Sequence, residues 1–211
     1  MSIRITGGLW RGRLLDVPGK GVRPTQDRVR AAIFSSMQDV IPGANVIDLF
    51  AGTGAFGLEA LSRGASFACF VEKDPTVLSF LRKNVARFMC GGDVKRGDED
   101  EAGRFMICRS DVMSFLGSSP DNGRADIIFA DPPYDSDGGW TKKILFHLSR
   151  RSILNEKGYL IIESGAKSPP VEAGGWNISW ERSYGETRVC VYKVRSSGLK
   201  DENLGRRTLS P

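Results

Sequence analysis

The sequence predicts an α/β fold in which helices cover both faces of a mainly parallel sheet. From Asn45 onward, short apolar runs alternate with segments of helical periodicity, a pattern typical of successive strand–helix–strand units. The apolar runs are continuous, as expected of parallel strands that are buried on both faces. With 211 residues, of which 40% are hydrophobic, the chain can form one large domain and a small appendage.

The expected elements follow one another without internal repeats. Residues 1–24 combine short strands with glycine-containing turns, and a helix is expected over 25–41, with Thr25 or Asp27 as its N-cap. Five strands of the parallel sheet are expected over residues 45–50, 65–73, 105–111, 124–131 and 158–164. Helices are expected between and after them over residues 55–64, 75–88, 112–118 and 140–154. Two β-rich runs that flank 183–187 predict an antiparallel hairpin at one edge of the sheet.

These elements divide the chain into three expected parts. They are an N-terminal β-rich extension with the first helix (1–44), the main α/β domain (45–195) and a flexible tail (196–211). The segment 91–103 is rich in glycine and charge, which predicts a surface loop.

The composition favours a protein that works inside the cell. Four dispersed cysteines without a C-x-x-C pair indicate reduced thiols, and a single histidine argues against His-rich metal sites and Ser-His-Asp triads. No signal peptide or membrane-spanning run is visible, so we expect a cytoplasmic protein. A monomer is the default expectation, since the sequence leaves the oligomeric state open. A net charge of +5 is a mild indication of a polyanionic partner.

A glycine-rich turn follows the first strand of the main domain. Gly52, Gly54 and Gly57 have the spacing G-x-G-x-x-G between a strand and a helix, where backbone N–H groups are free to bind a ligand. A turn without a ligand is the alternative. Asp48 lies four residues before Gly52, inside the strand, and an acid there suits a cationic group such as the ammonium of S-adenosylmethionine better than a pyrophosphate.

Acidic residues also end the next two strands. Glu72 lies 20 residues after Gly52, where a carboxylate can accept both ribose hydroxyls. Asp111 is a candidate acceptor for an adenine amino group, or else the N-cap of the helix that follows. Together with their neighbours, these residues form the predicted cofactor-binding set: Asp48, Phe50, Gly52, Gly54, Glu72, Lys73, Asp111 and Val112.

The fourth strand ends in the sequence Asp131-Pro132-Pro133-Tyr134. Proline fixes φ and lacks an N–H donor, so the carboxylate and a backbone carbonyl together offer two acceptors for an amino group. Tyr134 offers a flat face on which a heterocyclic base can stack. The four residues are therefore the candidate catalytic motif for methyl transfer to an exocyclic amine.

Arginines are concentrated in the first thirty residues. Arg11, Arg13, Arg23 and Arg28, together with Thr25, are the candidate RNA-binding residues, since a guanidinium pairs readily with phosphate oxygens. The alternative is a solvated face with local ion pairs, such as Asp27 with Arg28 or Arg30. Trp10 is a candidate for base stacking or for the core of a hairpin.

Several stretches, in this order, resemble one bacterial family. They are GGLWRGR (7–13), RPTQDRVRAAIF (23–34), DLFAGTGAFGLEALSRGA (48–65), VEKD (71–74) and DPPY (131–134). The resemblance covers the chain from about residue 3 to 194 and is to the RsmD-like 16S ribosomal RNA guanine-N2 methyltransferases. RPTQDRVR is the most discriminating stretch, because D-P-P-Y also occurs in DNA adenine methyltransferases.

The resemblance implies a Rossmann-like methyltransferase fold with S-adenosylmethionine as the methyl donor. It also implies a guanine in 16S rRNA as the acceptor, either in free RNA or in the 30S subunit. We expect no metal, because neither the acid nor the nucleophile of this reaction requires one. The alternatives are a DNA adenine-N6 methyltransferase, a nicotinamide-dependent oxidoreductase, and a noncatalytic RNA-binding or assembly protein on the same scaffold.

Overall fold

The computed structural model describes residues 3–19, 24–89, 103–118, 125–133, 135 and 137–195, with only the backbone described for 24–26. Arg23, Tyr134 and the expected tail over 196–211 lie outside these residues, as does nearly all of the charged segment 91–103.

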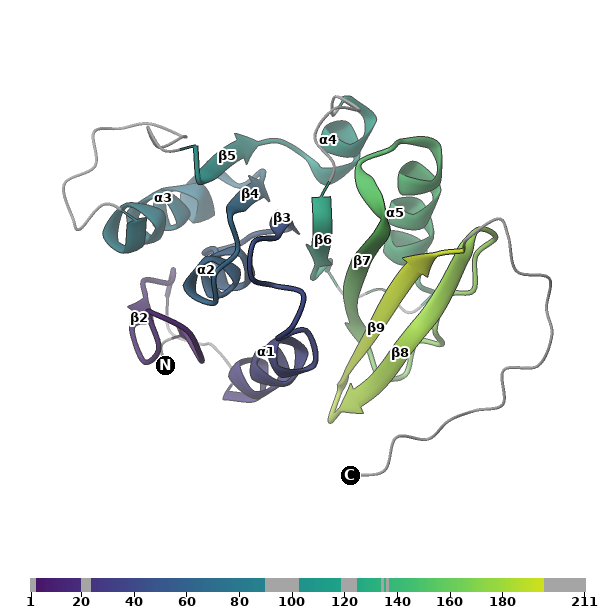
Figure 1. Ribbon diagram of the computed structural model, residues 1–211, viewed down its shortest axis with the longest axis horizontal. Coiled ribbons are helices and arrows are strands. Elements are labelled where there is room, and N and C mark those ends of the chain that lie inside the picture. The colour runs from purple at the N-terminus through teal and green to yellow at the C-terminus, as the bar shows by residue number, and fades with distance from the viewer. Residues whose placement is uncertain are drawn as a thin grey trace.

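A seven-stranded sheet with the order β5-β4-β3-β6-β7-β9-β8 forms the centre of the molecule (Figure 1). The first five strands in this order are parallel, and β9 joins β7 antiparallel as part of the C-terminal hairpin. The strands are β3 (Asn45–Leu49), β4 (Phe67–Glu72), β5 (Phe105–Arg109), β6 (Ala125–Ala130), β7 (Leu154–Gly165), β8 (Trp176–Tyr184) and β9 (Thr187–Val194). The predicted α/β fold and the edge hairpin are confirmed.

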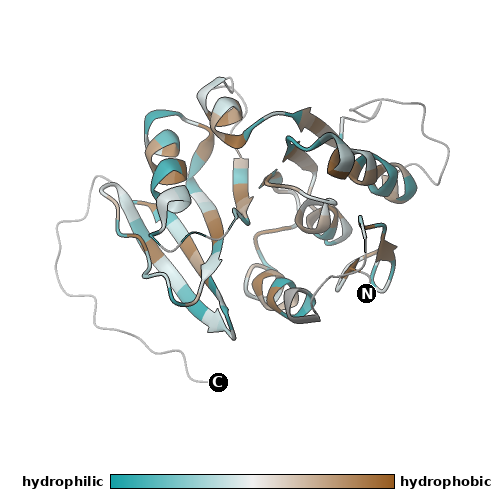
Figure 2. Ribbon diagram, turned by 180° about the vertical axis from the view of Figure 1, so that it is seen from behind, coloured by the Kyte–Doolittle hydropathy of each residue, from teal (hydrophilic) through white to brown (hydrophobic). Residues whose placement is uncertain are grey.

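Helices cover the two faces of this sheet. Apolar side chains of α4 and α5 pack on one face, and those of α1, α2 and α3 pack on the other. Figure 2 shows the resulting pattern, with apolar colour concentrated along the central strands and mixed colour around the helices and along the C-terminal hairpin. The helices are α1 (Pro24–Ser36), α2 (Ala55–Ser62), α3 (Pro75–Met89), α4 (Val112–Ser118) and α5 (Gly139–Arg150). In the part of the chain that the structure describes, no helix is long and apolar enough to cross a membrane.

The N-terminal extension is a two-stranded sheet, β1 (Ile3–Arg4) and β2 (Leu14–Leu15), that packs beside α2 and α3. Buried Glu59 of α2 fastens it to the domain. The carboxylate of Glu59 accepts hydrogen bonds from the Thr6 N–H (2.6 Å) and hydroxyl (2.8 Å) and from Arg63 Nε (2.8 Å). Ile5 and Leu15 add apolar contacts to the same side.

Several predicted helix boundaries are wrong. The helix expected over 25–41 ends at Ser36, and the helix expected over 55–64 ends at Ser62. The first helix begins at Pro24, so Thr25 and Asp27 lie within its first turn and neither is the N-cap. Proline is well suited to the first helical position, because it lacks an N–H that would be unpaired there. The helix α5 ends at Arg150, and Leu154, predicted to be helical, instead begins β7 and pairs with Ala125. Pairing in the sheet here overrides helical periodicity.

Candidate functional site

A cavity of about 420 Å³ opens at the carboxyl ends of the central strands. The chain runs outward from β3 to β4 and β5 and then returns to β6 on the other side of β3, and ligands commonly bind where strand order reverses in this way. The cavity is lined by residues from all four of these strand ends and from the start of α5: Phe50, Val71, Glu72, Lys73, Ser110, Asp111, Val112, Asp131, Pro132, Pro133 and Trp140.

The glycine turn between β3 and α2 contributes Phe50 to the cavity lining, whereas Gly52 and Gly54 are not among the lining residues, and their predicted contact with the cofactor stays a prediction. Gly52 and Gly54 have φ of 55° and 89°, in the left-handed region that glycine adopts without a steric cost. Phe50 has φ of 61°, which is uncommon for a residue with a side chain and often marks a functional site. Gly57 has another role: a Cβ at this position would lie 2.3 Å from Cε1 of Phe70. It therefore permits close contact between α2 and the sheet.

Asp48 lies beneath the glycine turn and is not one of the residues that line the cavity. Its Oδ2 accepts a hydrogen bond from the Gly57 N–H at 2.9 Å, which ties β3 to the first turn of α2. Burial, and to a smaller extent the charges of Asp131 and Glu72, raise the pKa of Asp48 to about 7, although the bond from Gly57 acts in the opposite direction. The predicted contact with a ligand ammonium stays a prediction, and the contact seen is with backbone.

Glu72 is held in place at the cavity wall. Its Oε2 accepts a hydrogen bond from the Gly52 N–H (3.0 Å) and its Oε1 accepts one from the Asp74 N–H (2.8 Å). A carboxylate oxygen has two lone pairs, so each can accept a further bond from a ligand hydroxyl. The structure therefore holds the two carboxylate oxygens of Glu72 at the cavity wall, where the sequence predicts an acceptor for ribose hydroxyls.

Asp111 caps α4 and also faces the cavity. Its Oδ1 accepts a hydrogen bond from the Met113 N–H at 2.9 Å, which confirms the N-cap alternative. Its Oδ2 lies 3.8 Å from the ammonium of Lys73, which is largely exposed. Because Asp111 also belongs to the lining, a ligand contact from the same carboxylate stays a prediction.

The fourth strand end places Asp131 at the boundary between the cavity and the protein interior. Burial raises the pKa of Asp131 to about 6. Pro132 is buried and Pro133 is exposed. The segment that follows is fixed by Asp135, which accepts hydrogen bonds from the N–H groups of Gly138 (3.1 Å) and Trp140 (2.7 Å). Asp131 is thus placed between a buried strand and an anchored loop.

Two aromatic rings close one side of the cavity. The rings of Phe50 and Trp140 meet edge to face, with centroids 5.2 Å apart. Trp140 and Ser110 line the cavity but were not among the predicted site residues. The sequence around Trp140 contains no motif that would predict its place in the site, because that place depends on how the loop before α5 is anchored.

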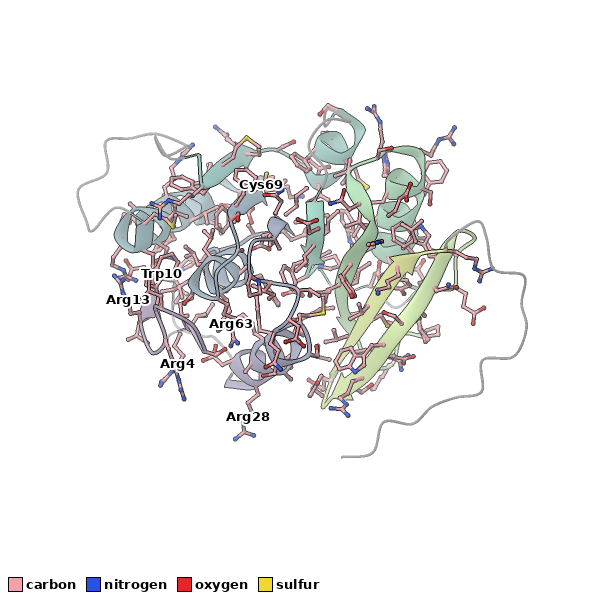
Figure 3. The ribbon with its side chains drawn as sticks, in the orientation of Figure 1. Arg4, Trp10, Arg13, Arg28, Arg63 and Cys69 are labelled. Carbon is pink, nitrogen blue, oxygen red and sulfur yellow. The ribbon has the colours of Figure 1, made fainter. Side chains whose placement is uncertain are left out.

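The N-terminal arginines separate into exposed and buried groups. Arg11, Arg13 and Arg28 are exposed, and in Figure 3 the side chain of Arg28 extends away from the molecule. The guanidinium of Arg13 lies over the ring of Phe88, 4.4 Å from its centroid, and so already makes a cation–π contact within the protein. Arg30 is buried and pairs with Asp27 at 2.8 Å, which confirms the local ion pair for this arginine.

Trp10 contacts the domain. Its ring packs edge to face on Phe88 with centroids 5.4 Å apart, and its backbone N–H donates to the Ser62 hydroxyl at 2.8 Å. Of the two alternatives for Trp10, the structure favours hairpin packing.

Among the described residues, Glu163 is a buried acid near the site that was absent from the predicted set. It lies close to the end of β7, only 7% exposed, in the run Tyr-Leu-Ile-Ile-Glu. A single acid within an apolar strand is the same signal that identified Asp48, and it was available in the sequence.

Comparison with known proteins assigns the family. The family model described as conserved hypothetical protein 95 matches residues 3–193. The chain belongs to this family.

Among curated relatives, ribosomal RNA small subunit methyltransferase D of Escherichia coli K12 is 36% identical over 204 residues, covering 95% of this chain and 94% of the relative. The protein of the same name from Haemophilus influenzae is 29% identical over 193 residues, covering 91% and 94%. The predicted resemblance to the RsmD-like family is therefore confirmed.

Solved structures agree with this membership. The structure of the putative methyltransferase YhhF from E. coli has a TM-score of 0.77 at 34% identity and covers 93% of this chain and 100% of its own. A hypothetical protein of Thermus thermophilus has a TM-score of 0.70 at 27% identity, covering 91% and 99%.

Proposed function

We propose that this protein transfers a methyl group from S-adenosylmethionine to the exocyclic N2 amino group of a guanine in 16S ribosomal RNA. The names of the family relatives support methylation of small-subunit rRNA, and the RsmD-like resemblance of the sequence supports guanine N2 as the acceptor atom. The observation that carries the proposal is the position of Asp131, at a strand end that borders the cavity predicted to hold the methyl donor.

The cavity fits S-adenosylmethionine by its donors and acceptors. Glu72 would accept hydrogen bonds from the ribose hydroxyls, and Asp111 would accept one from the adenine amino group. Phe50 and Trp140 supply apolar, aromatic surface for the remaining part of the ligand. When bound, this ligand supplies an electrophilic methyl group on a positively charged sulfur.

Asp131 would prepare the acceptor amine. The nitrogen lone pair of a guanine amino group is delocalised into the ring and is a weak nucleophile. When the Asp131 carboxylate and a proline carbonyl accept the two N–H hydrogens, they favour a pyramidal nitrogen and direct its lone pair toward the methyl carbon. After transfer, the nitrogen releases one proton, which Asp131 can accept. The predicted stacking on Tyr134 would hold the base, which must leave its stack to reach the site.

The proposal is tested by comparing the rRNA nucleosides of cells with and without this gene by mass spectrometry. We expect N2-methylguanosine in small-subunit rRNA to fall by one residue per ribosome when the gene is deleted. It should return when the gene is supplied on a plasmid. An unchanged N2-methylguanosine content, with loss of a different methylated nucleoside, would contradict the guanine-N2 assignment.

A second prediction concerns the exposed arginines. Changing Arg11 and Arg28 together to alanine should weaken binding to a 16S rRNA fragment by about 10-fold at low salt, because phosphate contacts are lost. The slope of log K against log salt should fall by about one to two units. Electrophoretic mobility shift at several salt concentrations measures both. Binding of S-adenosylhomocysteine, followed by calorimetry, serves as the control and should not change.

A further inference from the structure

Two acids lie side by side at the ends of β6 and β7, and the proposed chemistry uses only one of them. The strands run parallel with Phe129 opposite Ile161, and Asp131 and Glu163 each follow two residues later. Because side chains alternate between the two faces of a sheet, both acids point to the face where Phe129 and Ile161 pack beneath α1. Their electrostatic interaction agrees with this placement, since the charge of Asp131 raises the pKa of Glu163.

Neither acid has a hydrogen-bond donor within the described part of the chain, although Glu163 is only 7% exposed. The carboxyl oxygens of Asp131 and Glu163 are not among the fully enclosed polar atoms of the described residues, so they are open to a ligand that brings hydrogen-bond donors. Arg30 stabilises the charge of Glu163 from α1. The hydrogen bonds of Arg30 among the described residues, however, go to Asp27 and to the backbone carbonyl of Arg4.

The chemistry of the RNA bases indicates which ligand brings these donors. Adenine, cytosine and guanine each have an exocyclic amino group. In adenine and cytosine, the neighbouring Watson–Crick-edge ring nitrogen is an acceptor, and a carboxylate placed beside it would be repelled. In guanine, that ring nitrogen, N1, bears a hydrogen. Two adjacent acceptors therefore match guanine alone among the three.

We infer that Glu163 selects guanine by accepting the N1 hydrogen while Asp131 accepts a hydrogen of the N2 amino group. The inference rests on the proposed function and adds a substrate-binding residue to it. It assigns Glu163 to the acceptor base, which agrees with its absence from the lining of the predicted cofactor cavity.

The protonation of Glu163 is compatible with this role. Burial first, and then the charge of Asp131, raise the pKa of Glu163 to about 8, and Arg30 opposes the rise. Near neutral pH, Glu163 in the free protein therefore holds a proton. A carboxylic acid has a carbonyl acceptor beside an O–H donor, and guanine has N1–H beside the acceptor O6. The protonated side chain can thus form two hydrogen bonds with that edge of guanine, whereas it can form only one with the ring nitrogen of adenine or cytosine, so both protonation states of Glu163 favour guanine.

The test compares guanine with 2-aminopurine, which keeps the 2-amino group but lacks the N1 hydrogen and O6. Each base is placed by RNA ligation at the nucleotide that the wild-type protein methylates, and kcat/KM is measured by transfer of labelled methyl groups. The wild type should prefer guanine by about 100-fold, as expected for a well-paired base edge. Glu163→Ala should lose about 100-fold on guanine and little on 2-aminopurine, so that the preference falls below about 10-fold.

Two further variants separate recognition from structure. Glu163→Gln keeps the carbonyl acceptor and a donor beside it, so it should retain the preference and stay within about 10-fold of wild type on guanine. Glu59→Gln alters another buried acid that faces Arg30, away from the cavity, and should leave the preference unchanged. If Glu163→Ala lowers kcat/KM equally for guanine and for 2-aminopurine, the inference is overturned. If the wild type methylates no guanine at all, the proposed function fails first.

Discussion

Replacing Asp131 by alanine is expected to lower the rate of methyl transfer by about 1,000-fold or more. The change removes the acceptor that orients the amino group and takes its proton, while the strand and the anchored loop that flank it remain. Because Glu72 and Asp111 lie on other strands, the dissociation constant for S-adenosylmethionine should change by less than about threefold. Single-turnover transfer to small-subunit rRNA and calorimetric titration of the cofactor measure the two quantities. A variant that methylates at the wild-type rate would exclude Asp131 from catalysis.

The pH dependence gives a second measure of the same carboxylate. Burial raises the pKa of Asp131 to about 6, and the ionised form is the one that accepts hydrogens from the amine. The single-turnover rate should therefore fall as pH decreases through about 6, instead of through the range near 4 that is usual for aspartate. Asp131→Asn retains a carbonyl acceptor that does not titrate, so its much slower reaction should lack this acidic limb. A limb with the same midpoint in both proteins would assign it to another group.

The second large effect concerns stability. Gly57→Ala should destabilise the fold by about 2–3 kcal/mol, because the new Cβ would lie 2.3 Å from the ring of the fully buried Phe70. Such an overlap requires α2 to move away from β4, and it outweighs the usual gain of about 0.5–1 kcal/mol when alanine replaces glycine in a helix. For a chain of this size, the melting temperature should fall by about 5–10 °C in a thermal unfolding scan.

Gly117 of α4 provides the matched control. A Cβ at Gly117 would have no heavy atom within 4 Å, so Gly117→Ala should leave the melting temperature unchanged or raise it slightly. Equal effects of the two substitutions would show that the contact between Gly57 and Phe70 does not limit stability.

The order of strands and helices could be predicted because each apolar run is short and is followed by a segment of helical period. The ends of elements could not. Leu154 continues the apolar pattern of α5, but its pairing with Ala125 places it in β7. This contact depends on residues about 29 positions apart, and a local pattern contains no information about it.

The site shows the same division between local and long-range information. Asp131 and Glu72 could be found because acids at the ends of apolar strands meet at one edge of a parallel sheet. The bond from Gly57 to Asp48 depends on how α2 docks on β3, which no spacing rule describes. The burial of Arg30 was partly predictable, because it lies between core residues on α1, next to Val29 and three residues before Ile33.

The contacts of Glu59 link the N-terminal strands to α2. This carboxylate is fully buried, and two of its hydrogen bonds come from Thr6, 53 residues earlier in the chain. Loss of the first strands would leave this buried carboxylate without two of its three hydrogen bonds, at a cost of several kcal/mol. The N-terminal strands and α2 thus form one cooperative folding unit. Deletion of the arginine-bearing extension would therefore weaken the support of α2 and remove the surface that we propose to contact RNA.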